Sequence, residues 1–103
     1  MIKVLVVEDS PVVQEFLVHI LNSDPDLRVI GTAKDGQEAI EEVKSKRPDV
    51  ITMDIHMPKM NGFEATRKIM ETHATPIVIV SGSSSAAEVA STFHALEAGA
   101  LSV

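Results

Sequence analysis

Short apolar runs alternate with segments of helical periodicity along this chain. The apolar runs occupy residues 3–7, 27–33, 49–53 and 77–80, and a further run begins at residue 100. Between them, apolar positions recur three and four residues apart, which predicts helices. This alternation indicates an α/β fold: a doubly wound five-stranded parallel sheet with right-handed crossovers and helices on both faces. The near-continuous Val, Ile and Leu content of the runs agrees, because strands in such sheets are buried on both sides.

Local signals predict where the helices begin and end. Ser10 is suited to cap the first helix, and Pro11 to occupy its first position. Asp35-Gly36 breaks the second strand, and the helix after it should end before Pro48. The side chains expected to face the core are Val12, Val13, Phe16, Leu17, Ile20 and Leu21 in the first helix, Ala39, Ile40 and Val43 in the second, Phe63, Thr66, Ile69 and Met70 in the third, and Ala86, Ala90, Phe93 and Leu96 in the fourth.

Composition narrows the function classes. The 103 residues fit one domain, and an apolar content of 45% fits a folded globular chain. A net charge of −6 argues against nucleic-acid binding by this segment, because such binding needs Lys and Arg to neutralise phosphates. The lack of cysteine excludes disulfides, thiolate metal sites and cysteine nucleophiles. No apolar run is long enough to cross a bilayer, and the first strand follows Met1 without a separate signal segment, so we expect a cytoplasmic location and no membrane partner.

Carboxylates follow two of the apolar runs. Glu8 and Asp9 come directly after residues 3–7, and Asp54 comes directly after residues 49–53. Functional groups in open α/β sheets gather at the carboxyl ends of the strands, and in the order 2-1-3-4-5 the first and third strands are neighbours. Two like charges about 4 Å apart repel by about 4 kcal/mol at an effective dielectric near 20. We therefore expect a protonated carboxyl group or a bound hard cation, and Mg²⁺ suits one or two carboxylates with a carbonyl and waters.

A cation in this pocket suggests phosphoryl chemistry. Once the charge of an incoming phosphoryl group is neutralised, a carboxylate can attack phosphorus and form an aspartyl phosphate. Asp54, at the end of a rigid strand, is the expected nucleophile. Ser81 follows the fourth apolar run, where its hydroxyl could donate to a phosphoryl oxygen, and Gly82 leaves room for access.

Plainer roles for the same residues stay open at this point. One acidic residue at a strand end is usually a solvated loop residue or a helix cap, and Asp9 could serve only to begin the next helix. A serine after a strand is common turn chemistry. His56 is more often a solvated turn residue than a base, although its backbone carbonyl could face a metal ion. The joint placement of three carboxylates is what favours a chemical role.

Four motifs resemble the receiver domain of bacterial two-component response regulators, and they extend over the whole chain. The motifs are Val6-Val7-Glu8-Asp9-Ser10, Met53-Asp54-Ile55-His56-Met57-Pro58-Lys59-Met60-Asn61-Gly62, Val80-Ser81-Gly82 and Ala98-Gly99-Ala100. The resemblance implies the flavodoxin-like order 2-1-3-4-5 and one receiver domain over residues 1–103. Residues 21–27 and 75–81 are most similar to the receiver of chemotaxis protein-glutamate methylesterases, while receivers joined to DNA-binding domains share much of the first half.

The resemblance implies a phosphorylation site. Asp54 would accept a phosphoryl group from a histidine kinase. Asp9, helped by Glu8 and by the backbone carbonyl of His56, would hold Mg²⁺ beside it. Ser81 would be the hydroxyl that moves toward the phosphoryl group when the domain switches.

Three further positions matter through the resemblance alone. His56 and Ser83 occupy positions where receivers tune the lifetime of the acyl phosphate. Val103 stands where the family usually has a switch aromatic, which puts the usual aromatic switch in doubt. The fourth helix and fifth strand would form the face that contacts an effector domain or partner protein.

The end of the chain departs from the family. Receivers have an essential Lys, followed by Pro, at the close of the fifth strand, and then a final helix, and this chain stops before them. We therefore expect a C-terminally truncated receiver that lacks the end of the fifth strand and the last helix, with phosphorylation impaired by loss of the Lys. No Ser-His-Asp esterase constellation is evident, so any esterase activity would lie beyond Val103.

Three alternative functions remain open from the sequence. The chain could be a receiver-like interaction module without phosphotransfer, or the receiver of a DNA-binding transcriptional regulator. A flavodoxin-like nucleotide or flavin site is the third, but it needs a phosphate cradle after the first strand. Glu8 and Asp9 would repel a phosphate there unless a metal ion were present.

Overall fold

A parallel sheet with helices on both faces forms the described part of the molecule. The computed structural model describes residues 1–54 and 62–79. Its elements are β1 (Ile2–Val7), α1 (Pro11–Asn22), β2 (Leu27–Ala33), α2 (Gly36–Lys46), β3 (Val50–Met53), α3 (Gly62–Thr72) and β4 (Ile77–Ile79). The strands of these residues pair in parallel in the order β2-β1-β3-β4, which confirms the predicted order over this range. The predicted fifth strand and fourth helix lie outside the described residues.

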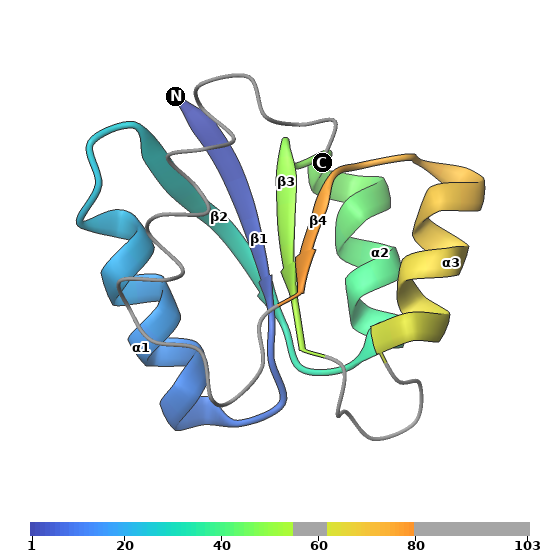
Figure 1. Cartoon of the computed structure of the whole chain (residues 1–103), viewed down its shortest axis with the longest axis horizontal. Coiled ribbons are helices and arrows are strands. Elements are labelled where there is room, and N and C mark those ends of the chain that lie inside the picture. Colours follow the sequence, from blue (N-terminus) through green and yellow to red (C-terminus); the bar gives the residue numbers. More distant parts are fainter. Residues whose placement is uncertain (55–61, 80–103) are drawn as a thin grey trace.

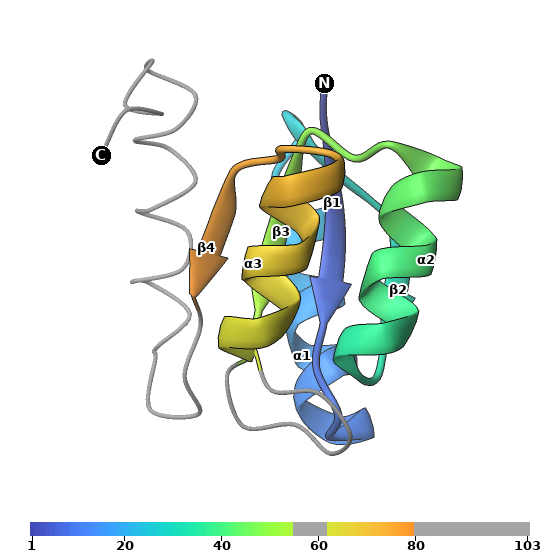
Figure 2. The same ribbon diagram turned by 90° about the vertical axis from the view of Figure 1, so that its right-hand side faces the viewer.

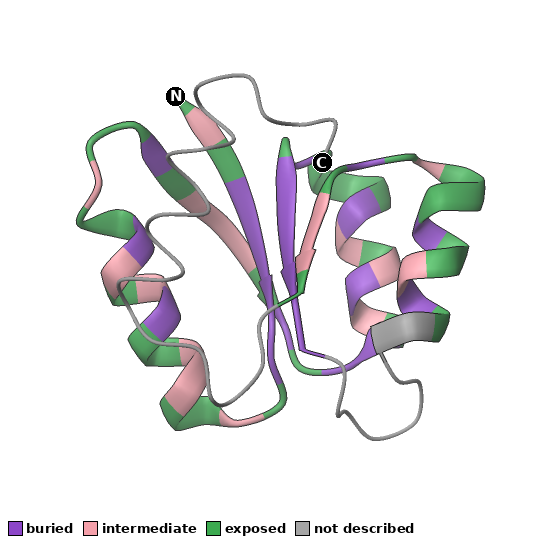
Figure 3. Ribbon diagram, in the orientation of Figure 1, coloured by how far each residue is buried: buried purple, intermediate pink, exposed green. Residues whose placement is uncertain are grey.

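Each face of the sheet has its own apolar core. Helix α1 covers one face, and α2 and α3 lie side by side on the other (Figures 1 and 2). Successive strand side chains point to opposite faces, so Val4 and Val6 pack toward α1, whereas Leu5 and Val7 pack toward α2 and α3. The central strands β1 and β3 are therefore buried along most of their length (Figure 3). None of the described helices is long and apolar enough to span a membrane.

The predicted helix boundaries are confirmed by their capping contacts. The Ser10 side chain accepts a hydrogen bond from the Val13 amide at 3.4 Å, and Pro11 is the first residue of α1. Asp35, predicted only to break the second strand, also caps α2, because its side chain accepts a hydrogen bond from the Glu38 amide at 2.8 Å. Helix α2 ends at Lys46, two residues before the proline expected to stop it.

The predicted inward faces of two helices were partly wrong. In α1, Leu17 and Leu21 are buried, but Val12 is 76% exposed and Phe16 is 52% exposed. The six apolar positions span a wider arc than one sheet face can cover, so those at its edge remain outside. In α3, Ala65 and Ile69 form the buried stripe, whereas Met70, which was predicted to face the core, is 51% exposed. Thr66 is partly buried, and the Phe63 side chain lies outside the described residues.

Candidate metal and phosphoryl-transfer site

Backbone hydrogen bonds bring the carboxyl ends of β1 and β3 into line. Val7 of β1 pairs with Met53 of β3, and the Asp54 amide donates to the Val7 carbonyl at 3.1 Å. On the other side of β1, the Glu8 amide donates to the carbonyl of Ala33, the last residue of β2, at 2.9 Å. The hydrogen bonding of the parallel strands thus continues one residue past each strand. Glu8 and Asp54, which follow the neighbouring strands β1 and β3, therefore lie at the same edge of the sheet.

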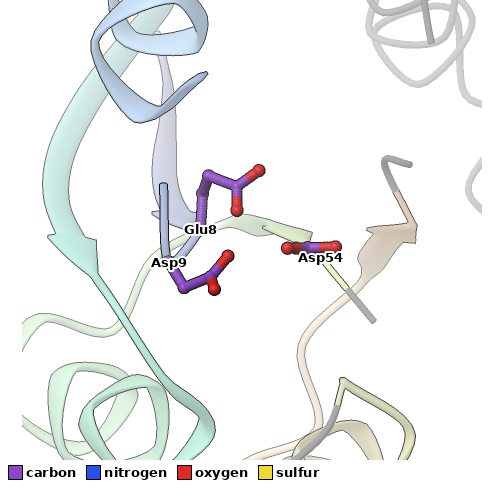
Figure 4. Close-up of side chains that lie close together, drawn as sticks. All are labelled: Glu8, Asp9 and Asp54. Atoms are coloured by element: carbon purple, nitrogen blue, oxygen red, sulfur yellow. The ribbon is translucent and has the colours of Figure 1, made fainter. Parts of the chain in front are cut away.

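Three carboxylates meet at that edge. One carboxylate oxygen from each of Glu8, Asp9 and Asp54 lies within 4.8 Å of the others. Figure 4 shows the Glu8 and Asp9 side chains, from the end of β1, beside Asp54, from the end of β3. Glu8 is 6% exposed and Asp54 is 9% exposed, while Asp9 lies at the surface. The predicted convergence of the three side chains is therefore seen in the structure.

The spacing suits a small hydrated cation. Mg²⁺–oxygen distances are about 2.0–2.1 Å, so two direct ligands on opposite sides of the ion lie about 4.2 Å apart. The carboxylate oxygens of the cluster lie within 4.8 Å of one another, a limit slightly wider than the separation of two such ligands. The ion could therefore be held after a small inward rotation of one side chain, or with one carboxylate bound through a water molecule. The three residues could hold a metal ion, and their oxygen-only donor set suits a hard divalent cation.

The cluster is electrostatically unfavourable without a cation. The pKa of Glu8 is raised from 4.5 to about 7, first because burial penalises its charged form, and then because its side chain shares hydrogen bonds with Asp54 and Asp9. The negative charge of Asp54 adds to this effect. The Ser10 amide, which donates to Glu8 Oε2 at 3.3 Å, acts in the opposite direction. A bound cation would favour the ionised form of all three groups.

Comparison with known proteins identifies the fold family. Residues 4–103 match the response regulator receiver domain. The chain belongs to this family.

Individual receivers agree with the predicted chemotaxis relationship. The chain is 71% identical over all its 103 residues to the protein-glutamate methylesterase/protein-glutamine glutaminase of Nitrosospira multiformis, and it spans 29% of that protein's length. The response regulator domain of Thermotoga maritima CheB is 49% identical, with a TM-score of 0.77 over 79% of this chain and 60% of that one. The CheX–CheY–BeF3–Mg²⁺ complex from Borrelia burgdorferi contains a chain that is 35% identical, with a TM-score of 0.72 over 78% of this chain and 61% of that one. The predicted similarity to methylesterase receivers is thus confirmed.

The remaining predicted site residues of this receiver lie outside the described residues. They are His56, Ser81, Ser83 and Val103. Their predicted roles as carbonyl ligand, switch hydroxyl, lifetime-tuning positions and switch position stay predictions. The structure therefore assembles the acidic half of the predicted site and does not test the other half.

The site also contains a residue that sequence reasoning missed. The Gln14 side-chain amide donates to the Glu8 carbonyl at 3.2 Å and to the Ala33 carbonyl at 3.4 Å. Both acceptors are backbone atoms, and they come from the ends of two different strands. A glutamine one turn after a helix cap carries no sequence signal for such contacts, because the partners become neighbours only in the folded sheet.

Proposed function

We propose that this receiver takes a phosphoryl group from a histidine kinase onto Asp54 and thereby regulates an output activity, in this case a chemotaxis methylesterase. The convergence of Glu8, Asp9 and Asp54 within 4.8 Å is the observation that carries the proposal. Three acidic groups gathered at a nearly buried strand end are costly unless the site handles a cation and an anionic substrate together.

Asp54, Asp9 and Glu8 have different roles in the proposed transfer. A carboxylate oxygen of Asp54 attacks phosphorus, the bond between phosphorus and the donor histidine nitrogen breaks, and that nitrogen keeps the electron pair. The hydrogen bond from the Asp54 amide to β1 holds the nucleophile in register. Asp9 and Glu8, the latter directly or through water, would hold Mg²⁺, which when bound neutralises charge on the phosphoryl oxygens.

Mg²⁺ is the proposed cation for two reasons. The donor set contains only carboxylate oxygens, and the cluster is small and partly open to water, as this strongly hydrated ion requires. The complex from Borrelia burgdorferi, which contains a 35% identical relative, includes Mg²⁺ and BeF3. In this proposal, Ser81 donates to a phosphoryl oxygen and the His56 carbonyl completes the metal ligands.

Incubation with acetyl phosphate and Mg²⁺, followed by intact-mass and peptide mass spectrometry, tests the proposal. The protein should be used in its full reading frame. One phosphoryl group should appear on Asp54, and Asp54→Asn should abolish the modification. Asp26→Asn, which changes an exposed aspartate, is the matched control and should leave it intact. A full-length protein that stays unmodified, although Mg²⁺ binds, would contradict the assignment.

The proposed output rests on the relatives. The receiver spans 29% of the length of the Nitrosospira multiformis methylesterase, which supports placing any esterase chemistry outside residues 1–103. In the proposal these residues form one receiver domain that acts on an effector domain or partner protein. The relatives favour this function over a receiver of a DNA-binding regulator, and the assembled carboxylates favour it over an interaction module without phosphotransfer. Cytoplasmic location stays a prediction.

A further inference from the structure

The Gln14 side chain joins three elements beside the acidic cluster. It projects from the first turns of α1, where the backbone amide of Gln14 donates to the Ser10 carbonyl at 2.9 Å. Its side-chain amide reaches the Glu8 carbonyl, after β1, and the Ala33 carbonyl, at the end of β2. One side-chain group therefore ties the helix to the carboxyl ends of two strands.

These contacts immobilise the peptide group between Glu8 and Asp9. The Glu8 carbonyl, which belongs to this peptide group, accepts from the Gln14 side chain, and the Glu8 amide, in the peptide group before it, donates to Ala33. A peptide unit is planar, so the Glu8 carbonyl lies in one rigid plane with the amide nitrogen and Cα of Asp9. Fixing the direction of that carbonyl therefore fixes where the Asp9 side chain begins.

We propose that Gln14 is a positioning residue that orients Asp9 for cation binding. The assignment rests on the proposed function, because it takes the carboxylate cluster as the Mg²⁺ site. Asp9 lies at the surface, whereas Glu8 and Asp54 are nearly buried in the sheet edge. Asp9 is thus the carboxylate whose placement depends most on the backbone before it, and Gln14 holds that backbone.

If Gln14 had a purely structural role, its hydrogen bonds would only help to hold α1 against the sheet. Asn22 provides the comparison, because its side-chain oxygen accepts from the Val29 amide at 2.9 Å and so joins the same helix to β2. Gln14 and Asn22 are both amide side chains, two turns apart on α1. Asn22 acts at the far end of the helix from the three carboxylates. Loss of either contact should loosen α1, but only loss of the Gln14 contact should disturb the metal site.

The test compares Gln14→Met with Asn22→Leu in the full-length protein. Both replacements are close in size to the original side chain and remove its hydrogen bonds without adding charge. Isothermal titration with MgCl2 gives the Mg²⁺ Kd, and thermal unfolding without Mg²⁺ gives Tm. We expect similar decreases in Tm for the two variants. Gln14→Met should raise the Mg²⁺ Kd by roughly tenfold or more, as is typical when a residue that supports a metal ligand is lost, and Asn22→Leu should leave it unchanged.

The outcomes separate this assignment from the proposed function. An unchanged Mg²⁺ Kd in Gln14→Met, or an equal increase in Asn22→Leu, would overturn the positioning role while the unsubstituted protein still binds Mg²⁺. A failure of the unsubstituted protein to bind Mg²⁺ would overturn the proposed function first, and this assignment with it.

NMR of the unsubstituted protein provides a second measurement if Gln14→Met does not fold. The side-chain amide protons of Gln14 should exchange with solvent more slowly than those of Gln37, which is exposed on α2. Mg²⁺ should shift the Gln14 side-chain signals and leave those of Gln37 in place. Identical exchange and identical response of the two glutamines would rule the assignment out.

Discussion

Glu8 carries an acidic side chain that is almost fully buried and lies beside two other carboxyl groups. Its folded-state pKa is raised to about 7, above the ordinary value of 4.5. Between these two pH values the folded protein binds a proton that the unfolded chain has released, so stability should fall as pH rises. This difference between the unfolded and folded pKa corresponds to a change of about 3 kcal/mol in the free energy of unfolding, which is shared among the three interacting carboxyl groups.

Glu8→Gln should remove most of this pH dependence. Without Mg²⁺, the free energy of unfolding of the unsubstituted protein should decrease from pH 4.5 to 7 and then level off, whereas the variant should give a nearly flat profile. Urea unfolding at a series of pH values, with EDTA present, provides the measurement. Glu15→Gln, on the exposed surface of α1, is the control and should keep the original profile. A flat profile for the unsubstituted protein would contradict the shifted pKa.

Thr52 presents a second unusual polar group in the sheet. It is 1% exposed, and its hydroxyl has no hydrogen-bond partner among the described residues. Burying such a group costs about 1–3 kcal/mol in proteins. Thr52→Val keeps the shape and removes the hydroxyl, so it should raise the free energy of unfolding by about 1 kcal/mol or more. Urea unfolding at constant pH tests this, and a loss of stability would show that the hydroxyl has a partner in solution.

At the scale of single elements, the start of a helix could be predicted from the sequence where it depends on residues close together in the chain. Ser10 and Pro11 define the start of α1 and were recognisable from their neighbours in the chain, whereas Asp35 was predicted only to break the second strand and also caps α2. The exposed Phe16 was misassigned because an apolar period shows which positions lie on one side of a helix, not how much of that side the sheet covers. Coverage depends on where α1 crosses β1 and β2.

The cap of α2 is a testable case of local control. The Asp35 side chain is 3% exposed and accepts from the Glu38 amide at 2.8 Å, which satisfies one of the free amides at the start of the helix. Asp35→Ala should destabilise the protein by about 1–2 kcal/mol. Asp35→Asn keeps an oxygen acceptor and should cost clearly less, as measured by chemical denaturation. Equal losses for the two variants would mean that the charge of Asp35, not its cap, matters.

At the scale of the whole molecule, cation binding and folding should be linked. The carboxylates come from the ends of two strands and are close together only in the folded sheet, so an ion bound there stabilises the folded state. At a free Mg²⁺ concentration about 100 times its Kd, the gain should be about 2.7 kcal/mol. Thermal unfolding with increasing MgCl2 should therefore show a rising Tm.

Substitution of the cluster separates specific binding from general effects of salt. Asp54→Asn should reduce the Mg²⁺-dependent increase in Tm, and Asp26→Asn should preserve it. Because removal of one negative charge also relieves repulsion, Asp54→Asn should be at least as stable as the unsubstituted protein without Mg²⁺. Equal responses of both variants to MgCl2 would indicate screening at the surface and no specific site.

The order of apolar runs was enough to establish an α/β fold with a parallel sheet, because strand and helix periods are properties of neighbouring residues. The position of Asp54 after a buried run was likewise readable, and so was the motif resemblance that led to the receiver family. The meeting of Glu8 and Asp54 could be predicted only by assuming a strand order, and the tertiary structure decided it, since it depends on β1 pairing with β3 in a register that aligns Val7 with Met53. It also decided the raised pKa of Glu8 and the contacts of Gln14, because burial and backbone partners from distant segments exist only once the sheet has formed.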